Sequence, residues 1–125
     1  MRALITLAVL FLTAACGEEE AEIPPTSFER DLAEKLNACS GCHGQEEPKG
    51  GLVLTDPRAL VNQPSSQADM VLIEPGNHLR SYLWHKVAGT HGIAGGLGQR
   101  MPAAEAWTKE DIELLGQWID LNLPQ

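Results

Sequence analysis

The chain has 125 residues, the length of one ordinary domain and too short for a barrel or a two-domain nucleotide enzyme. Its 17 acidic and 9 basic residues give a formal net charge of -8, whereas nucleic-acid binding needs a surplus of lysine and arginine. Hydrophobic residues make up 43%, as in a globular protein, although aromatic residues contribute only 5%. We therefore expect one folded domain that does not bind nucleic acid.

The first fifteen residues have the layout of a secretory signal peptide. Arg2 precedes an apolar run over residues 3–12, which is too short to span a bilayer. Small residues then lead to Cys16, so that residues 12–16 (LTAAC) resemble the lipobox of bacterial lipoproteins. In that family the signal is cleaved before the cysteine, which becomes lipid-modified. The resemblance implies that residues 1–15 are removed and that Cys16 carries a membrane anchor.

The segment after Cys16 predicts a tether. Gly17 in place of an aspartate is typical, in the lipoprotein family, of sorting to the outer membrane of a Gram-negative cell. Residues 17–25 contain four glutamates and end in two prolines, a composition that cannot bury a core. Alternatively, Cys16 is a spare thiol of an ordinary secreted protein. The chain is thus divided into a signal peptide at 1–15, the cysteine with its acidic tether at 16–27, and a folded body at 28–125.

The folded body begins with a predicted amphipathic helix. Thr26 and Glu29 match a capping box, in which each side chain bonds the other residue's backbone amide. The helix is expected to stop near Ser40-Gly41, and a brief second helix is expected from Asp56-Pro57. Apolar residues follow the capping box at spacings of four, four and three and predict one buried face, made of Phe28, Leu32, Leu36 and Cys39.

Two more helices are predicted in the second half of the chain. Leu79, Leu83 and Val87 repeat every four residues and predict a helix that ends at Gly89. Thr108 is expected to cap a final helix, which should end by residue 122. The apolar face of this final helix is predicted to be Ile112, Leu115, Trp118 and Ile119. Because the period is helical throughout, the sequence predicts a small all-α domain.

Residues 39–43 (CSGCH) carry the chemistry of the chain. Two cysteines separated by two residues and followed by a histidine form the attachment signature of c-type haem. Two thiols on one turn can form thioethers with the two vinyl groups at the porphyrin edge. His43 then directs an imidazole toward the iron, while the small residues Ser40 and Gly41 permit the close approach.

Three other interpretations of Cys39 and Cys42 remain open. A structural disulfide suits an exported protein but explains neither His43 nor the residues downstream. A thioredoxin-like pair normally opens a helix after a strand in a βαβ unit, and the chain has no βαβ pattern. A zinc site would need further ligands, and the chain holds no second cysteine pair. Export also favours haem, because bacteria attach haem covalently outside the cytoplasm.

A six-coordinate iron needs a second axial ligand. Met101 is the strongest candidate, because it follows a long glycine-rich loop able to wrap the haem edge and precedes a proline. Met70 lies in an apolar run and is expected to pack in the core. His78 and His85 are expected to face solvent, whereas His91 lies in the glycine-rich loop and remains a possible ligand.

These motifs together resemble the cytochrome c family, in particular its small monohaem, bacterial class I-like members. The resemblance covers essentially residues 28 to 121. The shared features are Cys39–Gly44 after a helix, Gly50-Gly51-Leu52, Pro75-Gly76-Asn77, Ser81-Tyr82-Leu83, Met101-Pro102, Trp107-Thr108 and Trp118-Ile119-Asp120.

The resemblance implies a helical cytochrome c domain packed around one covalent haem c. Cys39 and Cys42 would hold the haem, with His43 as the proximal and Met101 as the distal iron ligand. The protein would be an electron carrier and not an enzyme, exchanging single electrons with redox partner proteins. Its expected place is the periplasm, where lipid on Cys16 would anchor it, by the sorting pattern, to the outer membrane.

Two rival functions come from other classes. The first is a haem enzyme or gas sensor with an open or displaceable distal site, in which Met101 is not a firm ligand. The second is a haem-free lipoprotein that serves as a binding module and is stapled by a Cys39–Cys42 disulfide.

Overall fold

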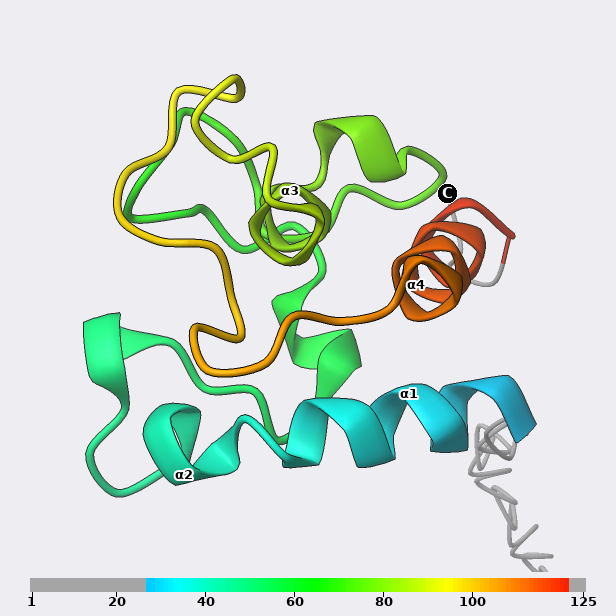
Figure 1. The fold of residues 1–125 in the computed structure, drawn as a ribbon, viewed down its shortest axis with the longest axis horizontal. Helices are drawn as coiled ribbons and strands as arrows, with labels where there is room; N and C mark the ends of the chain where they lie inside the picture. The colour runs from blue at the N-terminus through cyan, green and yellow to red at the C-terminus, as the bar shows by residue number, and fades with distance from the viewer. Residues whose placement is uncertain (1–26, 122–125) are drawn as a thin grey trace, which may run out of the picture.

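The computed structural model describes residues 27–121, and within them it contains four α-helices and three short 3₁₀ helices (Figure 1). Only isolated bridges join the extended segments of this range, and none of its residues forms a strand. The prediction of an all-α domain is confirmed. The predicted signal peptide, Cys16 and the tether up to residue 26 lie outside the described residues. In chain order the elements are α1 (Ser27–Asn37), α2 (Ser40–His43), η1 (Lys49–Gly51), η2 (Pro57–Leu60), η3 (His78–Arg80), α3 (Tyr82–Ala88) and α4 (Lys109–Leu121).

Helix α1 is amphipathic, as predicted, but it ends earlier than expected. Leu32 and Leu36 are fully buried, while the side chain of Phe28 and the capping residue Thr26 lie outside the description. The N–H of Cys39 bonds Leu36 O at 2.9 Å, and this short-range bond tightens the chain and closes the helix at Asn37. The prediction that the cysteines close this helix is therefore wrong, because they lie on the separate turn α2.

The helix predicted over residues 79–87 is in fact two elements. The side chain of Asn77 accepts the N–H of Arg80 at 3.2 Å and caps η3, and Ser81 then adopts an extended conformation before α3 begins. The buried Ser81 hydroxyl donates to Asn77 O at 2.9 Å, which stabilises this break. Leu79 consequently lies outside the buried face and is 59% exposed, contrary to the prediction, whereas Leu83 and Val87 are buried.

Two predicted caps are confirmed. The Asp56 carboxylate accepts the N–H of Arg58 at 2.9 Å and starts η2, whose first residue is a proline. The Thr108 hydroxyl accepts the N–H of Asp111 at 3.1 Å at the start of α4. Both short polar side chains thus satisfy backbone amides that have no partner within the helix.

The apolar core lies where α1, α3 and α4 meet. Helix α4 contacts α1 on one side and α3 with η3 on the other, as Figure 1 shows. Gly116 permits the close approach of α4, because a Cβ there would lie 3.2 Å from Trp84 Nε1. No helix among residues 27–121 is long and apolar enough to cross a membrane. The buried core side chains are Leu32, Leu36, Leu54, Leu60, Ile73, Leu83, Val87, Leu115, Trp118 and Ile119.

An ion pair joins α1 to α4 beside this core. Lys35 Nζ lies 2.7 Å from Asp111 Oδ1, and both side chains are only partly exposed. The hydrogen bond from Lys35 lowers the pKa of the Asp111 carboxyl below its ordinary value, and the bonds from Thr108 act in the same direction. The folded state therefore favours the charged form of Asp111 more than the unfolded chain does.

We predict that Lys35→Gln lowers the free energy of unfolding at neutral pH by about 0.2–1 kcal/mol, as for other partly exposed ion pairs. Because the pKa of Asp111 is lowered on folding, this contribution is present above the unfolded value of about 4 and is lost as the pH falls through the folded pKa. Urea unfolding of both proteins at pH 7 and pH 3 measures the change. Lys109→Gln, which breaks the exposed pair with Glu113, is the matched control and should have a smaller effect. A difference between wild type and Lys35→Gln that persists undiminished at pH 3 would contradict the assignment.

Candidate functional site

The turn from Cys39 to His43 is closed by one backbone carbonyl. Cys39 O accepts the N–H of Cys42 at 3.1 Å and the N–H of His43 at 2.9 Å. Residues three and four positions apart on a helical turn lie on one face. The structure therefore places Cys39, Cys42 and His43 together on the same side of α2, as haem attachment requires.

The two thiols are free and differ in environment. Cys39 is half-buried, packs against the core, and makes a long S–H contact of 3.9 Å to Lys35 O. Burial raises the pKa of the Cys39 thiol, and neighbouring Cys42 raises it further. Cys42 is exposed. One thiol is thus held by the protein interior while the other faces solvent.

His43 combines a firmly held backbone with an unpartnered ring nitrogen. Its carbonyl accepts the N–H of Leu54 at 2.9 Å, and the buried Leu54 side chain ties this bond to the core. Its Nδ1 is buried and has no hydrogen-bond partner among the residues that the structure describes. Such a nitrogen costs about 1–3 kcal/mol unless something outside the chain satisfies it. The free thiols and this imidazole therefore fit a covalently attached haem.

The chain leaves the turn through a glycine that cannot be replaced without movement. A Cβ on Gly44 would lie 2.6 Å from Ser40 O, inside the closest approach of real atoms. A Cβ on Gly41, within the same turn, would meet nothing within 4 Å. The residue after His43 must therefore be glycine-sized because the backbone leaves no room for a Cβ there, whereas the structure leaves room for a Cβ at Gly41.

A shallow hollow of about 620 Å³ lies beside Cys42. Polar and charged residues dominate its walls, so it lacks the apolar surfaces that bind a flat hydrophobic ring. Within residues 30–121 no group of three histidine, cysteine or acidic side chains is placed to hold a metal ion, and the zinc interpretation gains no further ligand there. The hollow is lined by Ser40, Gly41, Cys42, Gly44, Gln45, Glu46, Glu47 and Lys49.

Met101 lies on a segment that is bonded to the last turn of α3. Its N–H donates to Lys86 O at 3.0 Å. The guanidinium of Arg100 donates to Val87 O at 3.2 Å and to Trp107 O at 3.3 Å. The half-buried Met101 is thus positioned by α3 rather than by α2. The long loop before it was expected to be free to wrap a haem edge, but its end is held by these bonds.

His78 and His85 do not face solvent as expected. Both are half-buried and contact the ring of Trp84 in an edge-to-face arrangement, with ring centroids 4.8 and 5.3 Å away. His78 Nδ1 lies 2.7 Å from Asp120 Oδ2, and both nitrogens of His85 are bonded, one to Thr90 and one to the backbone. The two residues lie on different elements, η3 and α3, and helical spacing could not reveal these long-range partners.

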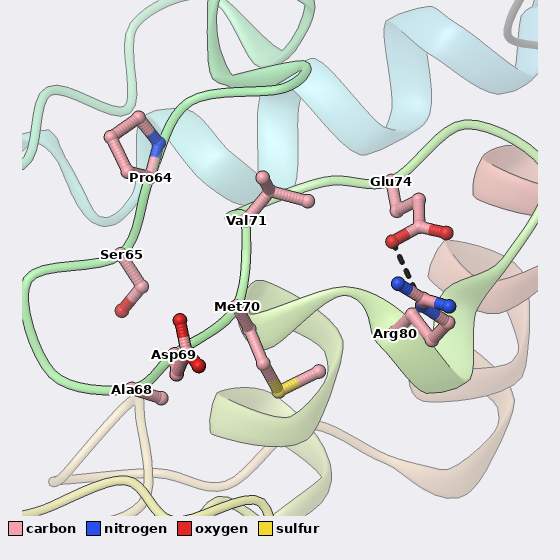
Figure 2. Close-up of a pocket in the computed structure, with 8 residues that line it drawn as sticks. All are labelled: Pro64, Ser65, Ala68, Asp69, Met70, Val71, Glu74 and Arg80. Carbon is pink, nitrogen blue, oxygen red and sulfur yellow. Dashed lines mark hydrogen bonds and ion pairs between the residues drawn. The ribbon is translucent and has the colours of Figure 1, made fainter.

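Met70 is not part of the core, and the expectation that it packs there is wrong. It is half-buried and lines a second hollow of about 430 Å³, shown in Figure 2. The Glu74–Arg80 ion pair, 3.0 Å long, lies at one side of this hollow. The apolar run around Met70 suggested burial, but isolated bridges turn alternate residues of this run in different directions.

His91 is the buried histidine of the glycine-rich loop and is only 9% exposed. Its Nε2 lies 2.9 Å from Gly98 O, while its Nδ1 is buried and has no partner within the described part of the chain. Sequence reasoning kept His91 as a possible ligand because of its place in the loop. Its burial depends on how the loop folds back on itself, which no local pattern shows.

The fold and the thiol-bearing turn describe a small helical domain with a CxxCH sequence, as in cytochrome c-like proteins. In agreement, the family model described as Planctomycete cytochrome C matches residues 39–93, a little less than half of the chain. The match supports a cytochrome c-like domain with covalently bound haem c, and thus a haem-based electron-transfer protein. It includes Cys39, Cys42, His43 and His91 and ends before Met101. Comparison with curated proteins and with solved structures found no significant match.

We predict that Gly44→Ala and Gly41→Ala differ sharply although they are three residues apart. Gly44→Ala should lower the free energy of unfolding by about 1–3 kcal/mol, because its methyl group forces the Ser40 carbonyl to move. It should also lower the yield of haem-bearing protein, since the turn carries the thiols. Gly41→Ala is the matched control for stability and should leave the free energy of unfolding close to wild type. Chemical denaturation and the ratio of haem absorbance to protein measure the effects, and equal behaviour of the two variants would refute this account of the turn.

Proposed function

We propose that this protein is an extracytoplasmic monohaem cytochrome c that carries single electrons between redox proteins. The observation that carries the proposal is the Cys39–His43 turn, where two free thiols and an imidazole share one face and His43 Nδ1 has no partner in the part of the chain that the structure describes. The match to a cytochrome c family model over residues 39–93 supports the same conclusion.

In this proposal, the thiols of Cys39 and Cys42 hold the haem and His43 is the proximal ligand. Cys39, packed against the core, fixes one point of attachment, and the Leu54 bond to His43 O sets the direction in which the imidazole leaves the backbone. Met101 is the distal ligand. A haem with one imidazole and one thioether ligand supplies a one-electron couple of raised potential, because the soft sulfur stabilises ferrous iron.

The chain serves electron transfer rather than the conversion of a substrate. An iron with two protein ligands in both oxidation states needs little rearrangement when an electron arrives or leaves. Met101 and Arg100 are bonded to backbone carbonyls of α3, which favours a ligand that stays in place. The rival function, a haem enzyme or gas sensor, would instead need an open distal position.

We further propose that the protein is lipid-anchored through Cys16 and faces the periplasm, with the outer membrane as its site. The LTAAC sequence at residues 12–16 and the acidic tether after it support this placement. The tether would join α1 at Ser27, whereas the thiol-bearing turn α2 lies at the opposite end of the helix (Figure 1). Eleven helical residues span about 16 Å. The haem-attachment turn would therefore point away from the anchor and toward soluble redox partners.

Mass spectrometry of the chain matured in a host with haem-attachment machinery tests the cofactor. We predict that the wild-type protein gains the mass of one haem and that the double variant Cys39→Ala/Cys42→Ala gains none. Cys16→Ser is the control, because it should lose the lipid but keep the haem. A wild-type protein that differs from the bare chain only by the loss of two hydrogens would instead establish the disulfide-stapled alternative.

Optical spectroscopy tests the distal ligand. We predict that Met101→Ala abolishes the weak near-red band that sulfur-to-ferric-iron charge transfer produces, while covalent haem is retained. The reduction potential should fall, because the thioether no longer stabilises ferrous iron. Met70→Ala is the control, since the other methionine should leave the band unchanged. A wild-type protein without the band that binds carbon monoxide readily would favour the gas-sensor alternative.

A further inference from the structure

The large apolar side chains that the described residues leave exposed are unevenly distributed. Two of the four lie on the loop of residues 90–98, here named the apolar loop, where Ile93 is 90% and Leu97 is 71% exposed. Single exposed apolar side chains are ordinary on protein surfaces, whereas a pair on one short loop is typical of a contact site. In Figure 1 this loop, drawn in yellow, lies on the far side of α3 from α1 and α2. The pair therefore projects away from the core that the helices form.

The backbone of the apolar loop is bonded within itself. The N–H groups of Ile93 and Ala94 donate to Thr90 O at 3.0 and 3.3 Å. The N–H groups of Gly95 and Gly96 also donate to carbonyls of the loop, at 3.2 and 2.8 Å. An apolar medium excludes water, so backbone groups can enter it only when partners in the protein satisfy them. The four consecutive N–H groups of residues 93–96 meet this condition.

The polar side chains of the apolar loop are engaged with the protein. The Thr90 hydroxyl lies 2.7 Å from His85 Nδ1, and Nε2 of the buried His91 lies 2.9 Å from Gly98 O. The loop contains no lysine, arginine, aspartate or glutamate. Its entry into an apolar medium would therefore remove water from two aliphatic side chains without removing it from a carboxylate, an ammonium or a guanidinium group.

Acidic residues are absent from the sequence on both sides of the apolar loop. None occurs between Glu74 and Glu105, although the chain has 17, and the same stretch holds Arg80, Lys86 and Arg100. Element η3, helix α3 and the loop thus present no carboxylate of their own. Anionic lipid headgroups repel carboxylates mainly within a Debye length of about 8–10 Å. The acidic chain can therefore approach a phospholipid surface more easily through this loop than through α1 or α4, which carry acidic residues.

The chemistry of the apolar loop suits lipid better than a protein partner. The residues that dominate protein interfaces are mostly tryptophan, tyrosine and arginine, seated in pockets and accompanied by hydrogen bonds. The loop has none of these three residue types, and the N–H groups of residues 93–96 are already bonded. Hydrocarbon requires neither hydrogen bonds nor a matching pocket, so projecting aliphatic side chains can enter it without either.

A lipid on Cys16 would make such a contact effective. Two aliphatic side chains alone bind a bilayer only marginally, because even one myristoyl chain gives reversible binding and stable anchoring takes two signals. An anchor in the same membrane raises the local concentration of the loop. Residues 17–26 separate Cys16 from α1, and ten residues extend at most about 35 Å, against about 30 Å for the diameter of a small domain. The anchor can therefore reach a membrane that the loop faces.

We propose that the apolar loop is a second membrane contact, in which Ile93 and Leu97 insert into the phospholipid surface that holds the lipid anchor. The proposal rests on the anchor and the haem proposed above. Contact through the loop fixes the orientation of the domain, which an anchor at a single point would not. Because α2 lies on the far side of α3 from the loop (Figure 1), the haem-attachment turn then faces away from the membrane and stays open to redox partners.

Electron paramagnetic resonance in oriented bilayers tests this arrangement. Full-length protein, shown by mass spectrometry to carry lipid and haem, is reconstituted into stacked bilayers of phosphatidylethanolamine and phosphatidylglycerol. We expect the ferric haem signal to depend on the angle between the bilayers and the magnetic field, because the docked domain has one orientation. Ile93→Ser/Leu97→Ser should lower the ratio of docked to undocked protein by about tenfold or more and abolish the angle dependence, since burial of one aliphatic side chain already contributes about that factor.

Leu79→Ser/Leu121→Ser is the matched control. These two side chains are also exposed, by 59% and 78%, but lie outside the apolar loop. The control variant should keep the angle dependence of the wild type. Circular dichroism and haem absorbance of both double variants in solution should match the wild type, which separates the loss of a contact from the loss of the fold.

Three results would overturn the proposal: a wild-type signal that does not depend on the angle, a loop variant that stays oriented, or a control variant that loses its orientation. The first would favour a protein partner as the occupant of the apolar loop. Each result leaves the anchor and the haem intact. A wild-type chain that matures without lipid or haem would contradict the proposed function, and with it the premise of the second contact.

Discussion

The carbonyl of Cys39 is the constraint on which the site depends. By accepting two backbone N–H groups, it winds five residues into one turn and brings both thiols and the imidazole to a single face. The bond from Leu54 then fixes the far end of this turn to the core. These bonds involve only main-chain atoms, so they restrict the side chains of residues 39–44 only where space is short. Gly44 is such a place, because its missing Cβ lets the chain pass Ser40 O.

The molecule is held together differently in its two halves. The packing of α1 against α4 buries Leu32, Leu36 and Trp118 almost completely, so apolar area stabilises that half. The loop after α3 instead exposes Ile93 and Leu97, by 90% and 71%. Hydrogen bonds to backbone carbonyls hold this loop in place. The proposed attachment turn adjoins the first half, whereas Met101 and His91 belong to the second.

Sequence reasoning succeeded where the cause is local and failed where it is not. The thiol pair and the caps at Asp56 and Thr108 depend on neighbours within four residues, and the structure shows the caps where they were predicted. Leu79 was predicted to share the buried face of Leu83 and Val87, because a helical period depends only on the spacing of apolar residues. The break that exposes it comes from hydrogen bonds of Ser81 to residues earlier in the chain. The burial of His91 likewise depends on loop closure, and no periodic pattern records that.

The polar attachment of the loop after α3 also means that the segment of Met101 can open while the ring of His91 stays in place. Segments held by few apolar contacts open at lower free energy than the core, so the loop after α3 can detach in parts without unfolding α1 and α4. Met101 depends on its bond to Lys86 O, whereas the ring of His91 is held by Gly98 O and by the neighbouring contact of Lys86 Nζ with Leu97 O. Breaking the first bond does not require breaking the others. The segment of Met101 and the buried ring of His91 therefore belong to separately bonded parts of one loop.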